Sequence, residues 1–303
     1  DYIIASGQNI GINIKSKGIM VVGLYNVGDV SPSKDAGIQL GDYITKIDGY
    51  VVNDINSMVN RITNSNDKNN VKITYLRGNN EITTNLKLIK SSDGIYKTGL
   101  YVKDTISGIG TLTFIDPETK MYGALGHEII DKNTALKIEV KDGKIFKSKI
   151  TGITKSSNGY PGEKNATFYS DNVYGSIIKN TSSGIFGNYG KEINNSKLYK
   201  VANKDEIKLG SAKILTVLKE EEIEEFNIEI IKINNNDNGI KNILFNITDE
   251  NMLKACGGVV QGMSGSPIIQ DDKIIGAVTH VVVDNPTKGY GIFITNMLEE
   301  MEK

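Results

Sequence analysis

The run VVQGMSGSPIIQDDKIIGAVTH, residues 259–280, contains a glycine-flanked serine between two apolar segments. A serine hydroxyl is a weak nucleophile and needs an adjacent base, an orienting acid and donors for the developing oxyanion. Gly262 permits a tight turn in which its own N–H and that of Ser264 point toward one spot. The run therefore predicts a nucleophile at Ser264 and an oxyanion hole formed by Gly262 and Ser264. A glycine-rich hairpin with incidental serines is the alternative.

An apolar strand, a polar hairpin and a second strand follow this turn, over residues 267–279. That order resembles the nucleophile loop of chymotrypsin-like serine proteases, in which the base histidine comes earlier in the chain. His127 ends the apolar segment MYGALGH and is the predicted base. The other histidine, His280, is expected in the wall of the substrate pocket, with a structural core histidine as its alternative.

The spacing of residues in the sequence does not identify the acid of the site. Asp171 lies in the region expected to join two barrels, and Asp131 lies close to His127 in the sequence. Asp249 lies shortly before Ser264. Nothing in the spacing of these residues selects one of them.

The composition limits the classes of function. Lys and Arg number 35 against 36 Asp and Glu, which gives a net charge of −1 and argues against a nucleic-acid partner. A single cysteine, Cys256, excludes an intrachain disulfide, and with only two histidines we expect no metal site and no cofactor. No apolar run is long enough to cross a bilayer. Because the chain starts at Asp1 without Met, we expect that an N-terminal segment was removed by processing or by design.

The pattern of apolar residues predicts a mainly β chain of two domains. Residues 1–92 predict a small α+β domain, with a helix over residues 53–65 and a hairpin around residues 78–80. Residues 93–303 hold about eleven short apolar runs separated by Gly, Asn and Asp, which favours a double β-barrel. The linker is expected within residues 90–98.

Residues 247–294, which include ITDENML, GGVVQGMSGSPI, GAVTHV and a GYG segment, resemble the stage IV sporulation protein B serine peptidases. The segment YGALGHEI, residues 122–129, adds to this resemblance, which covers nearly the whole chain. It implies a chymotrypsin-like double barrel and a serine endopeptidase without a cofactor. It also implies a catalytic triad of Ser264, His127 and Asp249.

The N-terminal domain resembles a bacterial PDZ domain, through QNIGI at residues 8–12 and DAGIQLGDYITKIDG at residues 35–49. The resemblance implies that Ile10, Gly11 and Ile12 form a carboxylate-binding loop, next to a strand that pairs with a peptide. The peptide is expected to rest against Met58 and Ile62 of the predicted helix, and the alternative is that these two side chains belong to the core. The PDZ ligand would be substrate, a membrane partner or the protein's own chain.

The resemblance further implies a membrane-anchored precursor that passes from the forespore into the space between the two forespore membranes. There such peptidases cleave a membrane-bound regulator of the intramembrane metalloprotease that activates a late mother-cell sigma factor. They also cleave themselves near the N-terminus. The remaining hypotheses are a catalytically silent PDZ scaffold and a general secreted quality-control protease.

Overall fold

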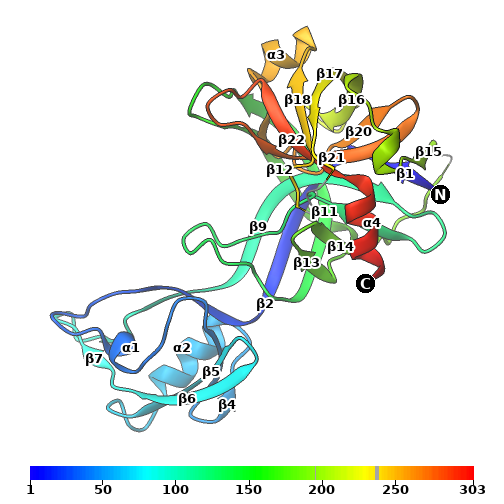
Figure 1. The fold of residues 1–303 in the computed structure, drawn as a ribbon. Coiled ribbons are helices and arrows are strands. Elements are labelled where there is room, and N and C mark those ends of the chain that lie inside the picture. The colour runs from blue at the N-terminus through cyan, green and yellow to red at the C-terminus, as the bar shows by residue number, and fades with distance from the viewer. Residues whose placement is uncertain (195, 236–238) are drawn as a thin grey trace. The chain divides into compact units, whose positions relative to one another are not determined.

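The structure is a computed structural model and describes residues 1–194, 196–235 and 239–303. The chain forms two compact units (Figure 1). The larger unit comprises Asp1–Asn13, Ser107–Ile129 and Gly143–Lys303, and the smaller unit comprises Ile14–Ile106 and Ile130–Asp142. None of the helices in the described residues is long and apolar enough to cross a membrane.

The units are joined by strands that continue from one into the other. These strands are β2 (Asn9–Leu24), β9 (Leu100–Ile115) and β11 (Val140–Thr154). The units therefore differ from the predicted division into residues 1–92 and 93–303. Composition does not reveal such a boundary, because a continuous strand carries no Gly- or Pro-rich break where it leaves one core for another.

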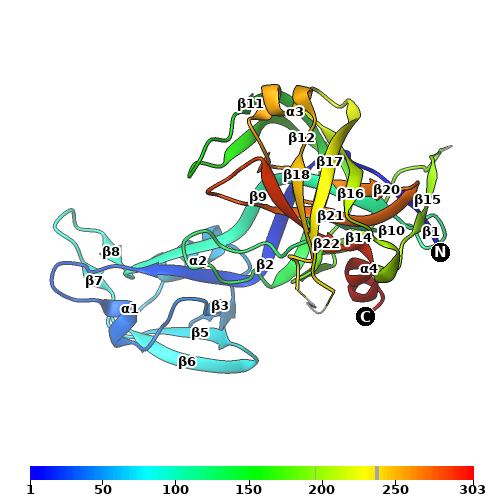
Figure 2. The same ribbon diagram turned by 45° about the horizontal axis from the view of Figure 1, so that its top comes forward.

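In the larger unit, one ring of antiparallel strands closes on itself (Figure 2). In order of pairing, its strands are β16 (Gly210–Val217), β17 (Ile223–Ile233), β18 (Ile243–Ile247), β22 (Lys288–Phe293), β21 (Lys273–Val281) and β20 (Pro267–Gln270). Buried side chains such as Ile214, Phe245 and Ile268 fill it. Buried and more exposed residues alternate along β17 and β18, whereas β20 and most of β21 are buried.

A second ring runs through β9, β10 (Met121–Ala124), β14 (Gly184–Asn188), β12 (Gly162–Ser176), β11 and β2. The bridge between Gly175 and Tyr189 joins β12 to the end of β14. The mainly β fold with a chymotrypsin-like double barrel is thereby confirmed. The remaining elements of this unit are β1 (Tyr2–Ala5), β13 (Lys179–Thr181), β15 (Leu198–Val201), a 3-10 turn (Lys204–Glu206), α3 (Glu250–Cys256), β19 (Val260–Gln261) and α4 (Ile294–Glu302).

The smaller unit has a core of its own. Its elements, besides parts of β2 and β9, are α1 (Pro32–Asp35), β3 (Tyr43–Ile47), β4 (Tyr50–Val51), α2 (Ile55–Thr63), β5 (Val71–Arg77), β6 (Asn80–Leu86), β7 (Ile89–Lys90) and β8 (Tyr96–Lys97). The predicted helix is confirmed as α2, which Asp54 caps by accepting from the N–H of Ser57 at 2.7 Å. The predicted hairpin is β5–β6. The expected linker instead forms the hairpin β7–β8.

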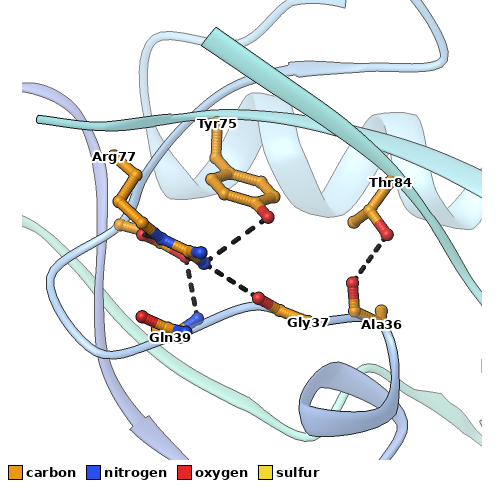
Figure 3. A network of polar contacts seen from close by, with 7 residues as sticks. Ala36, Gly37, Gln39, Tyr75, Arg77 and Thr84 are labelled. Atoms are coloured by element: carbon orange, nitrogen blue, oxygen red, sulfur yellow. Dashed lines mark hydrogen bonds and ion pairs between the residues drawn. The ribbon is translucent and has the colours of Figure 1, made fainter. Parts of the chain in front are cut away.

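A buried carboxylate ties the α1 region to the β5–β6 hairpin (Figure 3). The side chain of Asp42 is 2% exposed and accepts from Arg77 Nε at 2.9 Å and Arg77 Nη2 at 2.8 Å. Arg77 Nη2 also donates to the carbonyl of Gly37, and Thr84 donates to the carbonyl of Ala36. The fork of the guanidinium satisfies both carboxylate oxygens, as a buried charge requires.

The prediction of a carboxylate-binding loop at Ile10, Gly11 and Ile12 is wrong. These residues lie in the larger unit within β2, and Ile10 and Ile12 are buried. A Cβ atom on Gly11 would lie 2.1 Å from the ring of Phe146, so the glycine is required by close packing and not by a ligand. Short motifs of this kind do not reveal which core their strand joins.

The helix residues Met58 and Ile62 belong to the core of the smaller unit, which was the alternative considered for them. Met58 is 4% exposed, and Ile62 packs against the same cluster. Leu100 and Val102 of β9 contribute to this cluster, and the Asp104 carboxylate accepts from the N–H of Ile55 at 2.8 Å. The face of α2 predicted to bind a peptide thus packs into the core of its own unit.

Candidate active site

The turn that carries Ser264 connects β19 to β20 and depends on two glycines. Gly262 has φ +101° and Gly265 has φ +95°, conformations that favour glycine. A Cβ atom on Gly265 would lie 2.2 Å from the carbonyl O of Thr111 and 2.5 Å from the N of Leu125. The Thr111 N–H donates to the carbonyl of Ser264 at 3.0 Å. The turn therefore packs directly on β9 and on the loop that follows β10.

The two serines of the turn differ in accessibility. Ser264 is half-buried, and its hydroxyl donates to the carbonyl of Thr279 at 3.0 Å. Ser266 is 0% exposed and takes part in a buried hydrogen-bond network. Of the two, Ser264 is the one that a substrate can reach.

His127 follows a strained segment after β10. Leu125, with φ +69°, and Gly126, with φ +73°, lie in the left-handed region, which costs a branched side chain free energy. His127 Nδ1 lies 2.8 Å from the carbonyl O of Glu128, which can only accept, so Nδ1 carries the proton and Nε2 keeps its lone pair. Burial lowers the pKa of His127, so the imidazole is neutral, as a base must be, at neutral pH.

The second histidine lies beside the first. The ring centroids of His127 and His280 are 5.2 Å apart, and Nδ1 of His280 is buried without a hydrogen-bond partner among the described residues. Burial first, and then the nearby His127 and Lys241, lower the pKa of His280 to about 4. His280 is therefore neutral at neutral pH and lies next to the predicted base.

Thr279 brings these groups together. Its carbonyl accepts from Ser264, the next residue is His280, and a Cβ atom on Gly126 would lie 3.0 Å from its Cγ2. Ser264, His280 and Gly126, the residue before His127, thus lie at one segment of β21. In the described residues no hydrogen bond links Ser264 to either imidazole, because the hydroxyl proton is directed to Thr279.

The N–H groups predicted to bind the oxyanion donate no hydrogen bond within the described residues. Within the described parts of the chain, no acceptor lies within hydrogen-bond distance of the N–H groups of Gly262 and Ser264. The neighbouring N–H groups do have acceptors: Met263 donates to Val260, and Gly265 donates to Val278. In the described residues, the N–H groups of Gly262 and Ser264, on either side of Met263, therefore make no internal hydrogen bond.

The candidate acids lie in different surroundings. Asp249 caps α3: Oδ1 accepts from the N–H groups of Asn251 and Met252, and Oδ2 accepts from that of Asn227 at 3.1 Å. Among the described residues no hydrogen bond joins it to His127, so its role as triad acid stays a prediction. Asp131 lies in the smaller unit, paired with Lys103 at 2.6 Å, and Asp171 is exposed on β12.

Sequence reasoning missed the residues that support the turn. Glu128 supplies the carbonyl that orients His127, and Thr111 and Lys164 lie behind the nucleophile. A backbone carbonyl has no signature in the sequence, and Lys164 is one of many lysines. The part of the chain that the structure describes holds no cluster of His, Cys, Asp and Glu that would bind a metal ion.

Comparisons with known proteins identify two families in the chain. Residues 94–298 match the SpoIVB peptidase S55 family, and residues 9–88 match the PDZ domain family. No curated protein matches the chain.

Two solved structures are similar to parts of the chain. The PDZ domain of the SdrC-like protein from Listeria monocytogenes is 26% identical, with a TM-score of 0.26, and the match covers 30% of this chain and 93% of that one. The Rv3671c protease in its inactive form is 12% identical, with a TM-score of 0.36, over 64% of this chain and 83% of that one. The family match covers more than half of the chain and includes Ser264, His127 and His280, and the chain belongs to the SpoIVB peptidase S55 family.

Proposed function

We propose that the protein is a sporulation serine endopeptidase in which Ser264 is the nucleophile and His127 the base. The observation that carries this is the cluster at Thr279: the accessible Ser264 donates to its carbonyl, His280 follows it in the chain, and the ring centroid of His127, whose tautomer is fixed, lies 5.2 Å from that of His280. Family membership supports the reaction class, which is serine peptidase hydrolysis.

In the proposed reaction the Ser264 hydroxyl turns from the Thr279 carbonyl to Nε2 of His127. The serine oxygen attacks the scissile carbonyl while His127 takes its proton. The N–H groups of Gly262 and Ser264 stabilise the oxyanion, which is the largest electrostatic contribution in such reactions. His127 then protonates the leaving amine, and water hydrolyses the acyl-enzyme by the same steps in reverse.

The orienting group in this proposal is the carbonyl of Glu128. It fixes the imidazole tautomer as an aspartate does in a triad, since it accepts from the same ring nitrogen. Asp249, which the family resemblance implies as the acid, uses both carboxylate oxygens to accept from backbone N–H groups. We assign it to the support of α3, and its substitution distinguishes the two roles.

The neutral state of His280 favours catalysis by its neighbour. A second imidazolium 5.2 Å away would oppose the positive charge that His127 acquires in the reaction. Because the pKa of His280 is lowered to about 4, this repulsion is absent at neutral pH. His280 thus fits a wall of the substrate pocket next to the base.

The natural substrate we propose is the extracellular segment of a membrane-bound regulator of the intramembrane metalloprotease that activates a late mother-cell sigma factor. The peptidase would act in the space between the forespore membranes, from a membrane-anchored precursor, and would cleave itself near the N-terminus. The PDZ domain would bind this substrate, a membrane partner or the protein's own chain.

A catalytically silent scaffold is the second candidate, because Ser264 is hydrogen-bonded to Thr279 and not to an imidazole. A general secreted quality-control protease is the third.

An incubation experiment distinguishes these three candidate functions: the purified chain is mixed with the regulator's extracellular segment, and the products are identified by mass spectrometry. We expect defined fragments with the wild type and none with Ser264→Ala. Equal cleavage by both proteins, or none by either, would refute the peptidase. Cleavage of unrelated unfolded proteins at the same rate would favour quality control.

A further inference from the structure

Behind the nucleophile turn lies a lysine that the proposed mechanism does not use. Lys164, on β12, is 3% exposed, and its amine donates to Thr216 Oγ1 on β16 at 3.0 Å. A buried amine is costly unless it is hydrogen-bonded, so its position calls for an explanation. The side chain lies wholly within the larger unit.

A continuous chain of hydrogen bonds starts at this amine. Ser266 Oγ lies 2.9 Å from Thr216 Oγ1 and 2.6 Å from the carbonyl O of Met263. A carbonyl only accepts, so Ser266 donates to Met263, and the same hydroxyl is hydrogen-bonded to Thr216 Oγ1, which also accepts from Lys164. These contacts connect the Lys164 amine, through Thr216 and Ser266, to the carbonyl of Met263.

The carbonyl at the end of this chain belongs to the peptide bond between Met263 and Ser264. The N–H on the other side of that bond is the Ser264 N–H, one of the two proposed oxyanion donors. Because a peptide unit is planar, a hydrogen bond that holds its carbonyl also fixes its N–H. Donation to the carbonyl further polarises the N–H toward an incoming oxyanion.

The stem of the same lysine supports the other proposed donor. A Cβ atom on Gly262 would lie 3.0 Å from Lys164 Cδ and 3.2 Å from Lys164 Cβ, so the aliphatic part packs directly on this glycine. On the opposite side, Thr111 Oγ1 donates to the Gly262 carbonyl at 2.8 Å. One side chain thus contacts Gly262 and, through two hydroxyls, the peptide of Ser264.

We propose that Lys164 is a positioning residue of the oxyanion hole, which holds the Gly262 and Ser264 N–H groups in place through its stem and through the Thr216–Ser266 relay. This inference rests on the proposed peptidase function. Burial lowers the pKa of Lys164 to about 7, and both the charged and the neutral amine carry N–H groups that donate to Thr216. Burial raises the pKa of the neighbouring Cys256 thiol to about 11, so the thiol stays neutral.

The test measures the second-order rate constant for phosphorylation of Ser264 by diisopropyl fluorophosphate, which requires no natural substrate. Lys164→Met keeps the volume of the stem and removes the amine, and Thr216→Val removes the relay hydroxyl. We expect each to slow the reaction about 10- to 100-fold, the cost of a displacement of about 1 Å in an active site. Thr216→Ser, which restores a hydroxyl, should recover most of the rate.

The double variant Lys164→Met/Thr216→Val should be no slower than the slower single variant, because both changes break one chain. The midpoint of thermal unfolding should not fall in Lys164→Met, since a buried amine is replaced by an apolar group. The exposed Lys219→Met serves as the matched control and should react like the wild type.

An unchanged rate in Lys164→Met, or losses that multiply in the double variant, would overturn the positioning role and leave the peptidase intact. If Lys164→Met does not fold, the comparison of Thr216→Val with Thr216→Ser tests the relay. Equal rates of Ser264 phosphorylation in these two variants would overturn it. A wild-type Ser264 that does not react at all would overturn the proposed function, and the positioning role with it.

Discussion

The Ser264 turn of the larger unit and the expected ligand groove of the smaller unit were both predicted from short motifs, and the structure places their residues differently. Ser264 donates to Thr279, the neighbour of His280, and the ring centroids of His280 and His127 are 5.2 Å apart. The residues of the groove do not come together. Ile10, Gly11 and Ile12 lie in a strand of the larger unit, and Met58 is covered by the core.

The difference lies in what each motif specifies. Glycines at 262 and 265 adopt backbone conformations that few other residues accept, so the sequence dictates the shape of the turn directly. Whether a strand and a helix leave a groove open to a ligand depends on which other segment of the chain packs there. In this chain β9 supplies Leu100 and Val102 to the cluster around α2, and no local pattern announces that packing.

The largest effect is expected at the base. His127→Ala should lower the rate of Ser264 phosphorylation about 10⁴- to 10⁶-fold, as removal of a catalytic histidine does in other serine proteases. The wild-type rate should rise with pH through a midpoint below 6.5 and then level off, because burial lowers the pKa of His127 and only the neutral form accepts the proton. His280→Ala should cost far less. If His280→Ala lowered the rate more than His127→Ala, His280 and not His127 would be the base.

The second effect tests the close approach of the turn to β9. Gly265→Ala should lower the same rate about 100-fold, because a Cβ atom 2.2 Å from the Thr111 carbonyl forces the turn to move. Gly78→Ala is the matched control, since its φ is +61° and no atom lies within 4 Å of its Cβ position. Equal rates in the two variants would show that the turn tolerates displacement.

The third effect concerns the smaller unit alone. Arg77→Met should destabilise it by about 2 kcal/mol, because the Asp42 carboxylate loses its bidentate partner while it stays buried. Hydrogen exchange should speed up in residues of this unit's core, with Ser264 phosphorylation little changed. Lys46→Met, at an exposed ion pair, is the control. A loss of Ser264 reactivity in Arg77→Met would show that the two regions are energetically coupled.

The smallest effect is expected at Asp249. Asparagine is as good a helix cap as aspartate, so Asp249→Asn should change the rate by less than about threefold, and Asp249→Ala should cost about 1 kcal/mol of stability. Unfolding curves and phosphorylation rates measured on both variants give these values. A loss of about 10⁴-fold in Asp249→Asn would instead identify Asp249 as the triad acid.

The sequence by itself determined the mainly β class, the double barrel, the helix α2 and the glycine-dependent turn that carries Ser264. These follow from the period of apolar residues and from glycines whose conformation is local. Only the tertiary structure decided that residues Asp1–Asn13 belong to the larger unit, that the Glu128 carbonyl holds His127 Nδ1 and that Lys164 packs against Gly262. Each of these depends on contacts between segments far apart in the chain or on a backbone carbonyl, and neither leaves a pattern in the order of residues.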